Sequence, residues 1–381
     1  MRQFIVHTII TICLVLTGGT SAPKTAVAMT AVFTSHDVGF AEGGEPGDVV
    51  ARLPAMNAYT APRTPIIRLD VDWWYVQDCA GCALRFDRLD PVVTAAAASG
   101  MRVLLILDYS PPWANGHPGQ GTWFPTSDSA WAAIVDAVVA HFGSQVQAYE
   151  VWNEPNQQMF GNYGDGSSTA RKARYWQLVK IAYQRVHAGC PGCVVLAGAS
   201  ATGTPVTPSA ERNTNESAAW LKWGYTHGYQ PYFDAVTHHP YPAWNSGFGP
   251  ARPECSIRWW NMFGPNDPAC GELAAVRAVM VRYGDTTKRI WATEWGYPTA
   301  GNAGLSAAAV RDYAVQGVSM WRALDYTGPL FLYSYRDQAA VSGQSCAGQP
   351  TNPECHFGVS DMYGAPKEPI FSDLAAKLAN T

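Results

Sequence analysis

Two glutamates occupy positions where a pair of carboxylates could do chemistry. Glu154 follows a β-rich run at 146–152, with an asparagine before it and a proline after it. Glu294 closes a second apolar run, at 289–294, far downstream in the chain. If both runs are strands of one parallel sheet, the two carboxylates stand at the same end of that sheet. Carboxylates paired across a bound sugar hydrolyse glycosidic bonds, so the sequence predicts that chemistry.

The segments that must position these glutamates alternate between short apolar runs and helical patterns from Thr30 onward. The predicted strands are 31–35, 65–70, 102–108, 146–152, 193–198, 233–238, 289–294 and 328–334. The predicted helices are 85–98, 128–142, 168–187, 215–227, 270–283, 305–325 and 367–379. Several strand runs are apolar throughout, which indicates strands that are buried on both faces.

Eight strands, each followed by a helix, predict an α/β fold of the (β/α)8 or TIM-barrel type. A doubly wound open sheet is the alternative, but no glycine-rich phosphate loop follows the first predicted strand. No linker composition interrupts the chain, so we expect a single domain over residues 29–381. Its long loops follow strands and would lie on the C-terminal face, where barrel enzymes carry their sites. These loops are 109–127, 153–167, 239–269 and 335–366.

The N-terminal residues have the order of a secretory signal. Arg2 precedes an apolar stretch at 4–16, and small residues follow it up to Ala28. This order predicts a signal peptide over residues 1–28 and a secreted protein. A membrane anchor is the alternative, but the apolar stretch is shorter than the roughly 20 residues that a spanning helix needs. We therefore expect no stable membrane insertion after the signal is removed.

Composition narrows the class of protein further. Of 381 residues, 47% are hydrophobic and only 15% are charged, which is typical of a globular protein and argues against a disordered one. The formal net charge is −4, so nothing favours nucleic acid as a partner. The sequence carries no signal for the oligomeric state.

Cysteine usage agrees with export. Nine cysteines are present, and Cys13 falls within the predicted signal. The remaining ones lie in local pairs, which predict the disulfides Cys79–Cys82, Cys190–Cys193, Cys255–Cys270 and Cys346–Cys355. Two pairs have C-x-x-C spacing, which also fits zinc or redox sites, but an exported chain favours disulfides. We expect neither a metal nor a cofactor.

The two glutamate motifs together resemble a known group of enzymes. Asn153-Glu154-Pro155 after the fourth strand, with Glu294 after the seventh, is similar to the retaining glycoside hydrolases of clan A. The similarity is strongest to families 39 and 5, and in particular to short bacterial family-39-like polysaccharide hydrolases, and it spans about residues 30–375. The resemblance implies a (β/α)8 barrel in which Glu154 is the acid/base and Glu294 is the nucleophile.

The resemblance also implies roles for polar residues at other strand ends. Asn153 would bind the sugar 2-hydroxyl, and Arg68 would stand beside the nucleophile. A structural ion pair with Asp70 or Asp72 is the alternative for Arg68. His239 and Tyr241 match the clan's His-x-Tyr sequence, whose tyrosine orients the nucleophile. His238 and His239 could instead bind a metal, but alternation along a strand sends adjacent side chains to opposite faces.

Aromatic residues near the strand ends are candidates for stacking on sugar rings. Trp113 matches a loop of the clan that places an aromatic residue at the sugar site. Trp295 follows the second glutamate directly, and flat indoles suit contact with sugars. Many clan members carry a tryptophan at the end of the eighth strand. Here Tyr333 or Tyr335 must take that place.

These observations predict a secreted, retaining β-glycoside hydrolase that acts on a polysaccharide or oligosaccharide through a covalent glycosyl-enzyme. We expect endo-action, because family 39 exo-xylosidases add a β-sandwich domain for which this chain has no residues. An exo-β-glycosidase and a transglycosidase with the same two glutamates are alternatives. A non-catalytic sugar-binding barrel is another, although the presence of both glutamates argues against it. The loops that would choose the sugar do not identify it.

Overall fold

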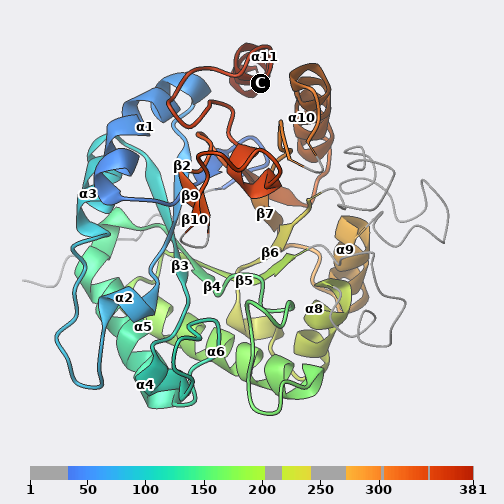
Figure 1. Cartoon of the computed structure of the whole chain (residues 1–381). Coiled ribbons are helices and arrows are strands. Elements are labelled where there is room, and N and C mark those ends of the chain that lie inside the picture. Colours follow the sequence, from blue (N-terminus) through green and yellow to red (C-terminus); the bar gives the residue numbers. More distant parts are fainter. Residues whose placement is uncertain (1–32, 202–216, 242–271, 302–303, 342–343, 381) are drawn as a thin grey trace, which may run out of the picture.

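The computed structural model describes residues 33–201, 217–241, 272–301, 304–341 and 344–380. Eight parallel strands form a closed barrel in chain order, and helices surround it (Figure 1). The strands are β1 (Val38–Ala41), β2 (Ile66–Asp70), β3 (Arg102–Leu107), β4 (Ala148–Val151), β5 (Val194–Ala201), β6 (Ala235–His239), β7 (Ile290–Trp295) and β8 (Thr327–Leu332). The predicted (β/α)8 TIM barrel is therefore confirmed.

The first strand is the one that the sequence pattern placed wrongly. The apolar run at 31–35 predicted it, but β1 begins at Val38. Between them the chain makes a turn in which the Asp37 carboxylate accepts a hydrogen bond from the Thr34 backbone N–H at 2.6 Å. Phe33 is buried because it packs on Trp291 inside the barrel, with ring centroids 4.6 Å apart. Its apolar character therefore serves the barrel interior and not a strand.

The helices that cover the barrel are α1 (Pro46–Thr60), α3 (Asp90–Ala98), α5 (Asp128–Phe142), α6 (Ser168–Gly189), α8 (Ser217–Thr226), α9 (Glu272–Arg282), α10 (Ala307–Arg322) and α11 (Ile370–Ala379). Two short helices, α2 (Trp73–Val76) and α4 (Pro112–Asn115), lie in loops. Ser127 caps α5 by accepting a hydrogen bond from the Ala130 N–H. The sequence pattern did not name α1, in which Pro54 interrupts the helical signal.

One apolar layer fills the barrel and a second one surrounds it. The inner layer consists of Phe33, Ile66, Leu104, Ile106, Ala148, Leu196, Ala235, Trp291 and Phe331. A Cβ at Gly39 would lie 2.2 Å from the Phe331 ring, so the glycine makes room for that ring. A larger cluster packs between the strands and the helices, and it includes Trp131 of α5 and Trp220 of α8. The inner layer gives the barrel an apolar floor.

Three of the predicted disulfides are present: Cys79–Cys82, Cys190–Cys193 and Cys346–Cys355. The fourth, between Cys255 and Cys270, lies outside the described residues, as does the predicted signal segment 1–28. Among the described helices, none combines the length and hydropathy that a membrane span requires.

Candidate active site

The side chains that point into the barrel change from apolar to polar toward the C-terminal ends of the strands. On β2, Arg68 follows the inner-layer residue Ile66 by two positions. On β4, Glu150 follows Ala148 in the same way. Because alternate residues of a strand share a face, both charged side chains rise from the apolar floor into one buried polar layer. His239, at the end of β6, completes this layer.

The two glutamates reach the polar layer through irregular backbone. Trp152 and Glu154 have φ angles of 66° and 42°, in the left-handed region that side chains other than glycine rarely adopt. On β7, the pairing register with β8 shifts between Ala292 and Trp295, which marks a bulge. The bulge lets Glu294 join the residues that face the barrel axis. Strain of this kind costs on the order of 1–3 kcal/mol per residue and is typical of functional sites.

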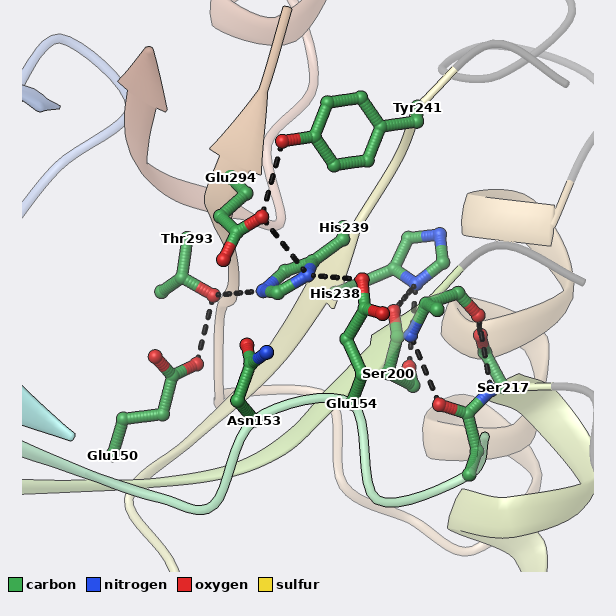
Figure 2. Close-up of polar contacts among 12 residues, drawn as sticks. Glu150, Asn153, Glu154, Ser200, Ser217, His238, His239, Tyr241, Thr293 and Glu294 are labelled. Carbon is green, nitrogen blue, oxygen red and sulfur yellow. Dashed lines mark hydrogen bonds and ion pairs between the residues drawn. The ribbon is translucent and has the colours of Figure 1, made fainter. Parts of the chain in front are cut away.

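Figure 2 shows the carboxylates of Glu154 and Glu294 approaching the same nitrogen of the His239 ring. The His239 Nδ1 atom is 2.9 Å from Oε1 of Glu154 and 3.7 Å from Oε2 of Glu294. One ligand-type atom from each of the three side chains lies within 4.8 Å of the other two. Retaining glycosidases hold their carboxyl groups roughly 5–5.5 Å apart, and inverting enzymes roughly 6.5–9.5 Å apart. The observed pair therefore has the spacing that suits a retaining mechanism.

The Glu294 carboxylate is held by two donors. Arg68 Nη1 donates to Oε1 at 2.6 Å, and the Tyr241 hydroxyl donates to Oε2 at 3.0 Å. Burial by itself raises the pKa of Glu294, but His239, Arg68 and the Tyr241 hydrogen bond outweigh it and hold the pKa below its usual range. Glu294 is thus an ionised carboxylate at neutral pH. A metal ion bound between Glu154, His239 and Glu294 would be repelled by the guanidinium of Arg68, which already neutralises the Glu294 carboxylate.

Arg68 connects the polar layer. Its Nε donates to Glu150 at 2.7 Å, and its Nη2 donates to the Asn153 side-chain oxygen at 3.1 Å. Within the described residues it forms no ion pair with Asp70 or Asp72, the alternative that the sequence left open. Burial favours the neutral form of a guanidinium, but Glu150 and Glu294 raise the pKa of Arg68 above its ordinary value. Arg68 therefore ties the nucleophile candidate to the asparagine of the Asn-Glu-Pro motif.

The two adjacent histidines face different surroundings, as strand alternation predicts. His238 Nδ1 lies 2.9 Å from the Ser200 backbone oxygen, away from the glutamates. His239 faces them, and its Nε2 lies 3.2 Å from the Thr293 hydroxyl. Burial lowers the pKa of both rings, but in His239 the negative charges of Glu294 and Glu154 outweigh it and raise the pKa.

Trp295 does not reach the site, and its assignment as a sugar contact is corrected here. It is fully buried, and a Cβ at Gly317 of α10 would lie 2.3 Å from its ring. The bulge that turns Glu294 toward the barrel axis turns Trp295 outward onto α10. An indole enclosed between strand and helix presents no face to a ligand.

The contacts of Trp113 and Tyr335 are with other residues of the loops and the core. The Trp113 ring packs edge-on against Trp73, with centroids 5.3 Å apart, and its Nε1 donates to the Gln77 backbone oxygen. Tyr335 is buried against Phe40. Of the two tyrosines at the end of β8, Tyr333 is the one near the site, and its ring lies 6.3 Å from that of Tyr241.

A third carboxylate, Glu354, stands near the pair and was missed by the sequence reasoning. It lies in the 3-10 helix η4 (Pro353–His356), next to the Cys346–Cys355 disulfide, and accepts a hydrogen bond from Tyr333. Burial, followed by the negative charges of Glu294 and Glu154, raises the pKa of Glu354 to about 7. The signal that could have found it is a glutamate beside a cysteine that fixes a strand-end loop.

Replacement of Tyr241 by phenylalanine tests the control of Glu294 ionisation. Because the hydroxyl stabilises the ionised form, its removal should raise the pKa of Glu294, so the acidic limb of kcat/KM moves to higher pH. Hydrogen bonds to charged groups predict a loss of about tenfold at neutral pH. Tyr149→Phe is the matched control, since its buried hydroxyl has no hydrogen-bond partner among the described residues. An unchanged pH profile of Tyr241→Phe would contradict the assignment.

Neither a family model nor a curated protein matches this sequence. Solved structures do match. A family 39 glycoside hydrolase from the gut symbiont Bacteroides cellulosilyticus has a TM-score of 0.68 and 20% identity, over 90% of this chain and 63% of that one. A monomeric β-xylosidase from Caulobacter crescentus has a TM-score of 0.63 and 19% identity, over 90% of this chain and 67% of its own length. A psychrophilic family 10 endo-β-1,4-xylanase has a TM-score of 0.58 and 12% identity, over 90% of this chain and 96% of its own length.

The chain thus spans about two thirds of the length of the first two structures. At these identities the likeness shows the fold alone, a (β/α)8 barrel.

Proposed function

We propose that this protein is a retaining β-glycoside hydrolase in which Glu294 is the nucleophile and Glu154 is the acid/base. The observation that carries the proposal is the close pair of strand-end carboxylates, one of which is held ionised by Arg68 and Tyr241. Different environments for two carboxylates are what separate an acid from a nucleophile in such a pair.

The reaction takes two steps. The ionised Glu294 attacks the anomeric carbon, the bond to the leaving oxygen breaks, and that oxygen takes the proton of Glu154. Glu154 then removes a proton from water, the water oxygen attacks the same carbon, and the bond to Glu294 breaks. Asn153 would hold the sugar 2-hydroxyl, since Arg68 fixes its amide oxygen and thereby aims its amide nitrogen.

The substrate and location follow from further features. We propose a β-linked polysaccharide or oligosaccharide that is cut within its chain, and the cavity described below supports internal cleavage. We also propose that the protein is secreted through the signal-like segment 1–28. Three disulfides support export, because disulfides persist in oxidising compartments.

The stereochemistry of the product tests this function. Purified protein is incubated with 4-nitrophenyl β-glycosides of xylose, glucose, mannose and galactose and with the matching β-linked polysaccharides. Proton NMR should show the β-anomer as the first product, before mutarotation. An α-anomer as first product would contradict the retaining mechanism. Binding without turnover of any probe would favour the non-catalytic barrel, and transfer products at high sugar concentration would favour the transglycosidase.

A further inference from the structure

A cavity of about 190 Å³ lies beside the polar layer of the barrel. It is formed by the segments that follow β1 and β2 and by the residues just before α3. Asp70, Asp72, Tyr75 and Arg88 are among the residues that line it. None of these residues has a role in the mechanism proposed above.

Asp70 connects the cavity to the proposed catalytic centre. It ends β2, two residues after Arg68, so it faces the same side of the strand. Arg68 in turn donates to Glu294 at 2.6 Å, and the negative charges of Glu294 and Glu150 act on Asp70. The side chain is solvent-exposed and forms no hydrogen bond within the described ranges. Its lone pairs are therefore available to a ligand.

Tyr75 gives the cavity an aromatic wall. Its side chain is 52% exposed, and the Arg88 guanidinium lies 4.7 Å from the centre of its ring. About half of the Tyr75 side chain is thus open to a ligand in the cavity. A flat ring with a hydroxyl at its edge, next to free carboxylate oxygens, suits the apolar face and the hydroxyl groups of a sugar.

We propose that this cavity is a second sugar subsite, on the non-reducing side of the scissile bond, for an uncharged unit of the substrate. This assignment rests on the proposed hydrolase function. The leaving group departs beside the acid Glu154, whereas Asp70 stands beside Arg68 and the nucleophile Glu294. The sugar that continues from the attacked unit toward Asp70 is thus the one on the non-reducing side.

Charge argues for a neutral sugar in this subsite. Partial desolvation at the strand end, with the negative charges of Glu294 and Glu150, outweighs the positive charge of Arg68 and raises the pKa of Asp70 to about 6, which leaves it ionised at neutral pH. Arg85 is paired with Asp78 at 2.7 Å, and Arg88 lies 3.5 Å from Glu45. Because both cations of the wall have acidic partners of their own, the free charge that meets a ligand is negative. A uronic acid would be repelled by Asp70.

Replacement of Tyr75 by alanine tests the subsite with two probes for each sugar that the wild type accepts. One is the 4-nitrophenyl β-glycoside of the single sugar, and the other is that of the β-linked disaccharide. Wild type should cut the disaccharide probe at the bond to 4-nitrophenol and release the intact disaccharide. Its kcat/KM for this probe should be at least about tenfold higher than for the single-sugar probe, because a factor of ten corresponds to about 1.4 kcal/mol of extra binding. Tyr75→Ala should lower kcat/KM about tenfold for the disaccharide probe and less than twofold for the single-sugar probe.

A matched control is Tyr326→Ala. Tyr326 also lies under an arginine, Arg277 at 5.0 Å, but it precedes β8 at the opposite end of the barrel. The Tyr326→Ala variant should leave kcat/KM unchanged for both the single-sugar and the disaccharide probe. Asp72→Asn provides a second variant, because asparagine tolerates the left-handed backbone of that position, φ 48°. It should also affect mainly the disaccharide probe.

The outcomes separate the two proposals. If wild type cleaves both probes and both cavity variants leave their ratio unchanged, the subsite is overturned and the hydrolase assignment stands. Equal loss on both probes overturns the subsite in the same way. If wild type cleaves no probe of any sugar, the hydrolase assignment fails, and the subsite fails with it.

Discussion

The Glu294→Gln variant should lose kcat on the order of 10⁴-fold or more toward every glycoside that the wild type cleaves, whatever the leaving group. Loss of a nucleophile removes the covalent step itself, and removal of a residue of this kind costs factors of that size. Arg68 keeps Glu150 as an ion-pair partner, and glutamine preserves the shape of the side chain, so the fold should be retained. Rates with aryl glycosides and the melting temperature check both expectations.

A smaller replacement identifies the role of Glu294 directly. In Glu294→Ala, azide can enter the space of the carboxylate and attack the anomeric carbon, which should restore turnover and give the α-glycosyl azide. Glu354→Gln is the matched control, because it removes another carboxylate from the same mouth and should retain far more activity. Full activity of Glu294→Gln, or a β-glycosyl azide from Glu294→Ala, would contradict the assignment.

The fold was predictable because local and global signals agree in a parallel barrel. Several of the predicted strands are continuous apolar runs, since both faces of such strands are buried. The run at 31–35 carried the same signal for a different reason, because Phe33 fills the end of the barrel and is not part of a strand. A run of hydrophobic residues indicates burial. It does not by itself distinguish a strand from an irregular segment that fills the end of the barrel.

The core of the site was predictable for a related reason. Arg68, Asn153, His239 and Tyr241 stand at or just after strand ends, so strand counting brings them together, and all four lie around the glutamate pair. The residue that strand counting could not place is Glu354. It reaches the site through a long loop whose path depends on a disulfide and on packing against other loops.

The misplaced aromatic residues show where the pattern rule fails. Simple alternation from Thr293 would turn Trp295 inward, but the bulge at Glu294 reverses the faces of the two residues. A single extra residue in a ladder exchanges which side chain reaches the site, and no composition signal marks it. The same limit applied to Tyr333 and Tyr335, whose roles were separated only by their contacts with Tyr241 and Phe40.

The Glu154→Gln variant should lose activity in a way that depends on the leaving group. A general acid contributes about 10²–10⁴-fold where the leaving oxygen needs a proton, so natural oligosaccharides and methyl glycosides should lose that much. The 2,4-dinitrophenolate group leaves without being protonated. A 2,4-dinitrophenyl glycoside should therefore form the glycosyl-enzyme in this variant at nearly the wild-type rate. This dependence separates an acid from a nucleophile, because the nucleophile is needed for every leaving group.

Azide distinguishes the two glutamates a second time. In Glu154→Ala, azide should attack the glycosyl-enzyme from the face that water uses, which gives the β-glycosyl azide, opposite to the product from Glu294→Ala. The hydrogen bond between His239 and Glu154 makes His239→Gln an informative companion, since this change disturbs the same carboxylate without removing it. It should lower activity on natural substrates more than on the dinitrophenyl glycoside. Equal losses on all leaving groups in Glu154→Gln would show that Glu154 is not the acid.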